Sequence, residues 1–269
     1  TTQSYNVFLG AYAGQDISGS GDDNIFIGTN AGRCNTSGEN NIAIGCEAGK
    51  CRDGSDNIMM GHRAGYGSAG VTNTGDWNVF LGHYAGKVVS TGCCNIALGY
   101  LSLGGSNVTG NSNISLGTCA GHDITSGEKN IFMGCKAGIG VTDSDYNIFL
   151  GAYAGNGSTS AGGCNIAIGY EAGKVTGDEN IFIGKGAGKG STTSGHNNVF
   201  IGCYAGNSSV GAGGNQFIGG NAGRNSTGAY NIAMGYHTLC GNGSHSGWNN
   251  VAIGMAAGRC ITGGGANVF

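Results

Sequence analysis

Short apolar segments that begin with asparagine and end with glycine recur along the whole chain. Residues 24–28 read NIFIG, residues 41–45 read NIAIG, and residues 78–82 read NVFLG. In a strand, successive side chains point to opposite faces, so the first and third apolar residues share one face. The central Phe or Ala shares the other face with the asparagine. Each segment is therefore predicted to be a β-strand.

The asparagines define a repeat of 15 to 21 residues with the consensus N-[IV]-[FA]-[ILM]-G-x-x-A-G and a turn-rich spacer. Copies begin at Asn6, Asn24, Asn41, Asn57, Asn78, Asn95, Asn113, Asn130, Asn147, Asn165, Asn180, Asn198, Asn215, Asn231, Asn250 and Asn267, and the last copy is cut short. We interpret residues 1–269 as one continuous array, truncated within a repeat at both ends. Pairs of helices need more than ~30 residues per repeat, so this period excludes them.

One strand and one spacer per repeat predict an all-β fold, a parallel β-solenoid (β-roll) of about fifteen coils. At ~4.8 Å per coil the array would be a rod on the order of 70 Å long. We expect the Ile/Val and Ile/Leu/Met positions to fill a narrow interior, as Ile25 and Ile27 would. The asparagines are predicted to stack into a structural amide ladder, and the invariant glycine to permit a turn with positive φ.

The nine phenylalanines all occupy the central strand position, which points away from the isoleucine pair. They are Phe8, Phe26, Phe80, Phe132, Phe149, Phe182, Phe200, Phe217 and Phe269. A phenylalanine stripe in water would be a large apolar patch, which soluble proteins avoid. Either the coil is a flattened roll that encloses both sets of side chains, or the stripe is a seam between chains around a threefold axis. We favour the seam, and with it a homotrimer.

Composition narrows the class of protein further. The chain has 59 Gly, no Pro, 39% apolar residues and only 10% charged residues. Glycine without a three-residue period excludes collagen, and the apolar share argues against disorder. The net charge is −3 and the basic residues form no run, so we expect no nucleic-acid partner. No apolar segment approaches the ~20 residues of a membrane span.

The motifs resemble two families. NIAIGCEAG (41–49) and NIAIGYEAG (165–173) are similar to repeats in the heads of trimeric autotransporter adhesins, which are left-handed parallel β-rolls. The longer period, the spacer NTSGENN (35–41) and the variant NIALGYLSL (95–103) more closely resemble bacteriophage tail-fibre repeats, including those of marine cyanophage virion proteins. The resemblance covers the whole chain. It implies a trimeric fibre, with a left-handed coil as the expected hand.

Eleven cysteines occur at related offsets in neighbouring repeats. Cys34 and Cys51 both lie ten residues after their asparagine and should stack in adjacent coils. Two further candidate pairs, which are nearly in register, are Cys119 with Cys135 and Cys240 with Cys260. Neighbouring strands are spaced compatibly with inter-coil disulfides. Free, buried thiols in a reducing compartment are the alternative, and we favour them.

Other side chains form columns when the repeats are aligned. Acidic residues precede the asparagine, basic residues follow nine positions after it, and tyrosines recur five or six positions after it. These columns could bind Ca²⁺ or glycans, but we favour solvated turns as the explanation of the charges and corner packing as that of the tyrosines. His62 and His83 share one offset in adjacent repeats. No catalytic motif or metal-ligand spacing is present, so we expect no enzyme, cofactor or metal.

We therefore expect the shaft of a phage tail fibre or related virion appendage, which holds a receptor-binding tip away from its anchor. The alternative is a bacterial surface adhesin or extracellular filament whose repeats bind glycans or other surfaces. Expected partners are other copies of the chain and a host-surface glycan. Both interpretations place the protein on a virion or outside the cell.

Overall fold

The computed structural model describes residues 5–17, 21–67, 73–157, 162–174, 177–190, 195–209, 213–241 and 246–269. Each repeat contributes one three-residue strand, and the described residues contain no helix. The strands are β1 (Val7–Leu9), β2 (Ile25–Ile27), β3 (Ile42–Ile44), β4 (Ile58–Met60), β5 (Val79–Leu81), β6 (Ile96–Leu98), β7 (Ile114–Leu116), β8 (Ile131–Met133), β9 (Ile148–Leu150), β10 (Ile166–Ile168), β11 (Ile181–Ile183), β12 (Val199–Ile201), β13 (Gln216–Ile218), β14 (Ile232–Met234) and β15 (Val251–Ile253).

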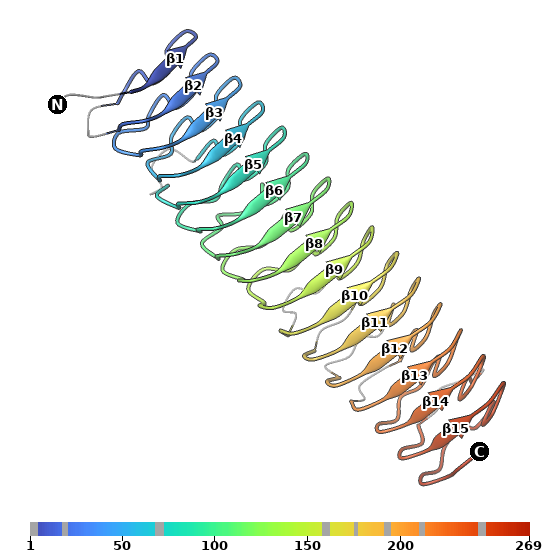
Figure 1. The fold of residues 1–269 in the computed structure, drawn as a ribbon. Helices are drawn as coiled ribbons and strands as arrows, with labels where there is room; N and C mark the ends of the chain where they lie inside the picture. Colours follow the sequence, from blue (N-terminus) through green and yellow to red (C-terminus); the bar gives the residue numbers. More distant parts are fainter. Residues whose placement is uncertain are drawn as a thin grey trace. The chain divides into compact units, whose positions relative to one another are not determined.

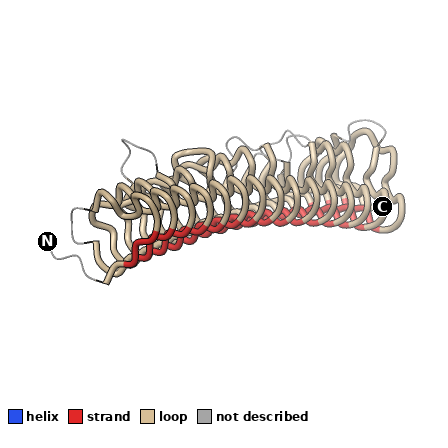
Figure 2. Tube along the Cα trace, turned by 90° about the horizontal axis from the view of Figure 1, so that it is seen from above, coloured by secondary structure: helices blue, strands red, loops and turns tan. Residues whose placement is uncertain are grey.

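Within the set β1–β8 and within the set β9–β15, each strand pairs in parallel and in register with the strand of the next repeat. Phe26 of β2, for example, lies opposite Ala43 of β3, and Phe200 of β12 lies opposite Phe217 of β13. The chain divides into two compact units, residues 1–136 with β1–β8 and residues 137–269 with β9–β15. In each unit every repeat forms one coil (Figure 1), and the strands line one side of the coils (Figure 2). The predicted parallel β-solenoid is confirmed.

The structure reverses the predicted inside and outside of the strand. In β2, Phe26 is fully buried while Ile25 and Ile27 are partly exposed, and most other strands repeat this pattern. The central strand position is therefore the inner position, and the flanking apolar residues occupy outer positions. Our assignment of the Ile25 and Ile27 positions to the interior is wrong. The phenylalanines between Phe26 and Phe217 are buried inside a single chain, whereas Phe8 and Phe269 in the end coils stay partly exposed.

The Ala-Gly pair of the motif makes room for the phenylalanine ring. Ala31, seven residues after Asn24, is fully buried. Gly32 follows it with a φ of 57°, and a Cβ atom there would collide with the ring of Phe26. The small pair thus leaves a slot in which the ring lies flat against the turn of its own coil. Rings in consecutive coils stack along the axis, as Phe200 and Phe217 do with centroids 4.9 Å apart.

Two coils lack this Ala-Gly pair and fill the slot differently. Leu103 and Leu239 stand where the second glycine would be, and both are buried. Their coils carry Ala97 and Ala233 at the inner position, so the leucine supplies the volume that a phenylalanine supplies elsewhere. Both leucines adopt positive φ, 48° and 46°, as the glycine does. The exchange conserves the interior volume, which is the condition under which close-packed interiors tolerate substitution.

The ladder asparagines from Asn24 to Asn250 are buried, and the ladder connects consecutive coils through backbone groups. Asn24 accepts a 2.9 Å hydrogen bond on its side-chain oxygen from the backbone N–H of Asn41. Its side-chain amide donates to the carbonyl of Gly38 at 2.9 Å, three residues before Asn41. Side-chain to side-chain bonds also occur, as from Asn113 to Asn95 at 3.1 Å. Each asparagine therefore clamps the turn that leads into the next strand.

The glycine that ends each strand occupies a backbone conformation closed to other residues. Gly45 has a φ of 134°, and a Cβ atom on it would lie 2.6 Å from the carbonyl oxygen of Gly61 in the next coil. Conformation and packing both require glycine there. Two further positions in each coil, just before the asparagine and six residues after it, have φ near 60° in nearly all coils. Asp23 and Trp77 are examples of the first, and Asn30 of the second.

Candidate functional site

The outer strand face is an apolar surface that each unit exposes. Strands β1–β15 present two outer positions each, and every one is Ile, Leu, Val or Met except Gln216 of β13. Most of these side chains are partly exposed, and some are more than a third exposed, such as Met60 at 42% and Ile168 at 36%. In each unit the strands that carry these residues line one side of the coils (Figure 2).

A second candidate surface is an aromatic cluster at the coil edge that follows β4, β5 and β6. It consists of His62, His83, Tyr84 and Tyr100. His83 stacks on Tyr84 with ring centroids 4.1 Å apart, and Tyr100 meets both rings at 5.5 and 6.5 Å. His62 Nδ1 lies 2.9 Å from His83 Nε2. The shared offset that the sequence indicates for the two histidines thus brings their rings together.

Charged groups support the aromatic cluster from the neighbouring coil. Glu47 accepts hydrogen bonds from Lys50 at 2.7 Å and from Arg63 at 2.5 Å. These two bonds, that from Lys50 first, lower the pKa of Glu47. Arg63 also donates to the hydroxyl of Tyr84 at 3.0 Å and lies 5.7 Å from its ring centroid. These contacts hold the Tyr84 ring in place beside Tyr100, whose exposed side chain is the part of the cluster that a planar or sugar ring could stack on.

Two members of the predicted basic column pair at the surface with carboxylates that lie outside the predicted acidic column. Arg33 approaches Asp16 at 3.5 Å, and Lys189 bonds Glu171 at 2.5 Å. Each basic partner stands nine residues after its asparagine, and each acidic partner comes from the preceding coil. Exposed pairs of this kind contribute ~0–1 kcal/mol. We see in them local support for the turns and no binding centre.

All eleven cysteines lie in the described residues and are free thiols in the structure. Cys34 and Cys51 do lie together: burial, followed by a hydrogen bond with Cys34, raises the pKa of Cys51 to about 12. Burial also raises the pKa of Cys119, which has Cys135 within electrostatic reach, and that of Cys240, which has Cys260. The structure thus places the members of each predicted pair near one another. Disulfide formation in these candidate pairs stays the alternative to the free thiols that we favour.

Arg52 is a residue that the sequence analysis missed. Its side chain is buried inside a coil, donates to the carbonyl oxygens of Val89 at 2.7 Å and Gly75 at 3.3 Å, and lies 5.1 Å from the ring centroid of Phe80. Burial lowers its pKa to about 10. The only available signal was its offset, eleven residues after Asn41, where other coils place buried residues such as Val89.

Among the described residues, no group of three or more His, Cys, Asp or Glu side chains could hold a metal ion. Within the same part of the chain, no helix is long and apolar enough to cross a membrane. The fold and these surfaces define a parallel β-solenoid repeat protein, a fold compatible with structural and fibrous roles. No protein-family model matches the chain, and no curated protein matches it at a significant level of similarity.

Proposed function

We propose that this chain is a structural segment of a fibre, in which copies of the solenoid associate through their outer strand faces. The observation that carries the proposal is the aliphatic stripe on β1–β15. Parallel sheets occur almost only where both faces are covered, and their strands then read as continuous apolar runs. Segments such as IFI in β2 read in that way, yet in one chain only the inner face is covered.

The size of the stripe suits a stable interface. The first unit alone presents two outer positions on each of eight strands. If each aliphatic side chain exposes ~50 Å², the unit offers ~800 Å², which is one partner's share of a standard interface. We propose a second copy of the chain as the binding partner, because its outer side chains recur at the same coil spacing and can pack between those of the first copy. A closed threefold arrangement would cover the stripe of every copy.

The role we propose is mechanical. Stacked coils joined by buried hydrogen bonds give a stiff element that separates two other parts of an assembly. The motif resemblance favours the shaft of a phage tail fibre or related virion appendage. No catalytic role forms part of the proposal, because the distinctive side chains of the described residues are mostly members of repeated columns.

Sedimentation equilibrium of the purified chain tests self-association. We expect a mass that is a multiple of 26.7 kDa at micromolar concentration, with three copies favoured. Ile96→Gln combined with Ile114→Gln should shift the mass toward that of the monomer. Gln216 in β13 shows that the fold accepts glutamine at an outer position. The matched control is Thr118→Gln, an exposed position outside the strands. A wild-type monomer at these concentrations would refute the proposed interface.

A second candidate function is glycan binding by the aromatic cluster, which would make the protein an adhesin. The stacking of His83 on Tyr84 beside Tyr100 favours it. Oligosaccharide-array binding should be lost in Tyr84→Ser and Tyr100→Ser. It should persist in Tyr230→Ser, which changes a more exposed tyrosine of the second unit. Absence of binding by the wild type, or equal binding by all three variants, would exclude the cluster as a glycan site.

A further inference from the structure

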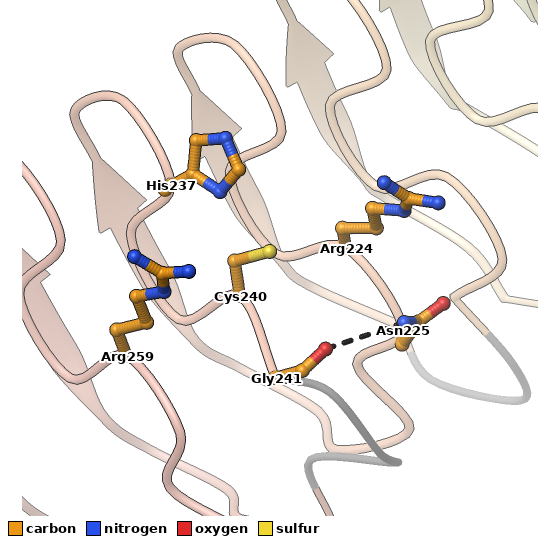
Figure 3. Close-up of a pocket in the computed structure, with 6 residues that line it drawn as sticks. All are labelled: Arg224, Asn225, His237, Cys240, Gly241 and Arg259. Atoms are coloured by element: carbon orange, nitrogen blue, oxygen red, sulfur yellow. Dashed lines mark hydrogen bonds between the residues drawn. The ribbon is translucent and has the colours of Figure 1, made fainter.

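A pocket of about 290 Å³ opens among the turns after β13, β14 and β15 of the second unit. Figure 3 shows its wall, which comprises Arg224, Asn225, His237, Cys240, Gly241 and Arg259. Arg224, Cys240 and Arg259 occupy the same motif position, nine residues after their asparagines, in three successive coils. The solenoid register therefore places Cys240 between two guanidinium groups, as the view displays.

The positive charge of this pocket is uncompensated. No Asp or Glu follows Glu179 in the sequence, whereas residues 180–269 contain Lys185, Lys189, Arg224 and Arg259. Glu179 precedes β11, two coils before β13, which at ~4.8 Å per coil is ~10 Å away along the axis. That distance is about one Debye length at physiological ionic strength, so Glu179 gives the two arginines little compensation. The ion pairs found in the described residues include neither arginine.

The other polar groups of the wall supply no negative charge that would neutralise the two arginines. Burial raises the pKa of Cys240, so its thiol stays protonated at neutral pH and supplies no negative charge. Asn225 donates its side-chain amide to the carbonyl of Gly241 at 3.3 Å and closes one side of the pocket. His237 Nε2 lies 3.5 Å from the amide nitrogen of Asn221, while its Nδ1 is buried without a hydrogen-bond partner. If Nε2 accepts from that amide, the proton lies on Nδ1, which is then a donor without an acceptor.

We propose that this pocket binds the oxyanion group of an anionic ligand, with Arg224 and Arg259 as its two cationic contacts and His237 as a third donor. Arginine presents its N–H groups in a planar fork that matches sulfate, phosphate and carboxylate oxygens. The free ion and a sulfated saccharide offer the same group, and the volume admits either. The site goes beyond the structural role, since all six wall residues come from one chain and the pocket does not depend on self-association.

Calorimetric titration of the whole chain tests the site, with sodium sulfate, glucose 6-sulfate and neutral glucose as probes at constant ionic strength in NaCl. We expect one site per chain with a dissociation constant of ~1 mM for an oxyanion probe, and no binding of glucose. Tighter binding of glucose 6-sulfate than of sulfate would identify a saccharide as the source. Saturable binding of sulfate alone would identify the free ion.

Variants distinguish the pocket from general charge attraction. Arg224→Gln combined with Arg259→Gln should weaken oxyanion binding at least tenfold, and because both side chains are exposed the fold should survive. Lys189→Gln is the matched control, since Lys189 occupies the same motif position but pairs with Glu171 outside the pocket. No saturable binding by the wild type, or equal binding by the double variant, would overturn the proposal. An equal loss in Lys189→Gln would overturn it as well.

Discussion

Asn180 accepts a 2.9 Å hydrogen bond on its side-chain oxygen from the backbone N–H of Asn198, the equivalent residue one coil later. Its side-chain amide donates to the carbonyl of Gly195 at 3.0 Å. Asparagine is the residue that can accept from one backbone group and donate to another at this short reach. Aspartate lacks the donor and would bury a charge. This explains why the ladder position is asparagine in every repeat and never aspartate.

Replacing Asn180 by Ala should lower the free energy of unfolding by ~2–4 kcal/mol. The substitution leaves the amide of Asn198 and the carbonyl of Gly195 buried without these partners, and each such loss costs ~1–3 kcal/mol. Urea unfolding followed by circular dichroism measures the change. Asn156→Ala is the control, because Asn156 lies in a turn and is not fully buried. Equal effects of the two substitutions would contradict the clamp.

Leu103 fills the space that a phenylalanine at the inner position fills in other coils. The effects of substitutions at Ala97 and Leu103 on stability should therefore not be additive. Leu103→Gly should leave a cavity and cost ~2 kcal/mol or more, and Ala97→Phe should crowd the slot. Together the two changes restore the phenylalanine and the second glycine of the common motif, so the double variant should recover most of the loss. A thermodynamic cycle should give a coupling of ~1–3 kcal/mol. Additive effects would show that the leucine and the ring occupy different spaces.

Gly202→Ala should be among the most destabilising single methyl additions. Gly202 has a φ of 135°, and the added Cβ would lie 2.6 Å from the carbonyl oxygen of Gly219. Backbone strain of this kind costs ~1–3 kcal/mol before the collision is counted, so we expect at least ~3 kcal/mol. Gly263→Ala serves as reference, since a Cβ there meets only the Ser246 hydroxyl at 3.5 Å. Thermal unfolding of both variants tests this prediction, and similar melting temperatures would refute it.

The thiol of Cys51 should resist alkylation over a wide pH range. Its pKa is raised to about 12 from an ordinary value near 9, first by burial and then by a hydrogen bond with Cys34. Since the thiolate is the nucleophile, iodoacetamide at pH 8–10 should modify the exposed Cys46 much faster than Cys51. Between pH 9 and 12 the folded state retains a proton that the unfolded state loses, so this group makes stability fall as pH rises.

Peptide mapping by mass spectrometry measures the two labelling rates. Cys34→Ala should speed the labelling of Cys51, because it removes one of the two main causes of the raised pKa. Equal rates for Cys46 and Cys51 in the wild type would contradict the buried thiol. A Cys34–Cys51 cross-linked peptide in non-reduced protein would support the disulfide alternative over the free thiols that we favour.

Arg52 allows a test of whether its hydrogen bonds outweigh the burial of its charge. Arg52→Met keeps an apolar stem near Phe80 but removes the donors to Val89 and Gly75. Hydrogen bonds from charged groups contribute ~1.5–3 kcal/mol each, while burying the cation costs several kcal/mol. We expect a net loss of ~1–2 kcal/mol in denaturant unfolding and less than ~0.5 kcal/mol for Lys87→Met, at a less buried site. Greater stability of Arg52→Met would show that desolvation dominates.

The strands, their parallel register and the coil per repeat could be predicted because periodicity and spacing reflect local backbone geometry. The inner face could not be assigned from alternation alone, because both faces of IFI and VFL are apolar. A signal was nevertheless present in the sequence: Leu103 and Leu239 replace the second glycine only in coils with alanine at the inner position. That exchange indicates that the ring and the turn share one space, and hence that the ring lies inside.

Residues at the same distance from their asparagines could be predicted to lie side by side in adjacent coils, as the pairs His62–His83 and Cys34–Cys51 illustrate. The positive φ values were predicted for glycine but not for residues such as Asp23 and Trp77. Residues at these positions share no chemistry, so no sequence signal marks them. The stacked backbone imposes the conformation, as where the N–H of Trp77 bonds the carbonyl of Ser55 in the preceding coil.

Because each ladder asparagine fixes the turn before the next strand, the length of a unit along its axis does not depend on how many residues its spacers contain. The clamp uses only the asparagine, the next asparagine and the glycine three residues before it, as Asn24, Asn41 and Gly38 show. Spacers of different length change how far a coil projects sideways, while the backbone bonds keep the rise of each coil constant. Insertions in spacers could therefore alter the lateral surface without shifting any neighbouring coil, and within each unit axial distance is set by counting asparagines.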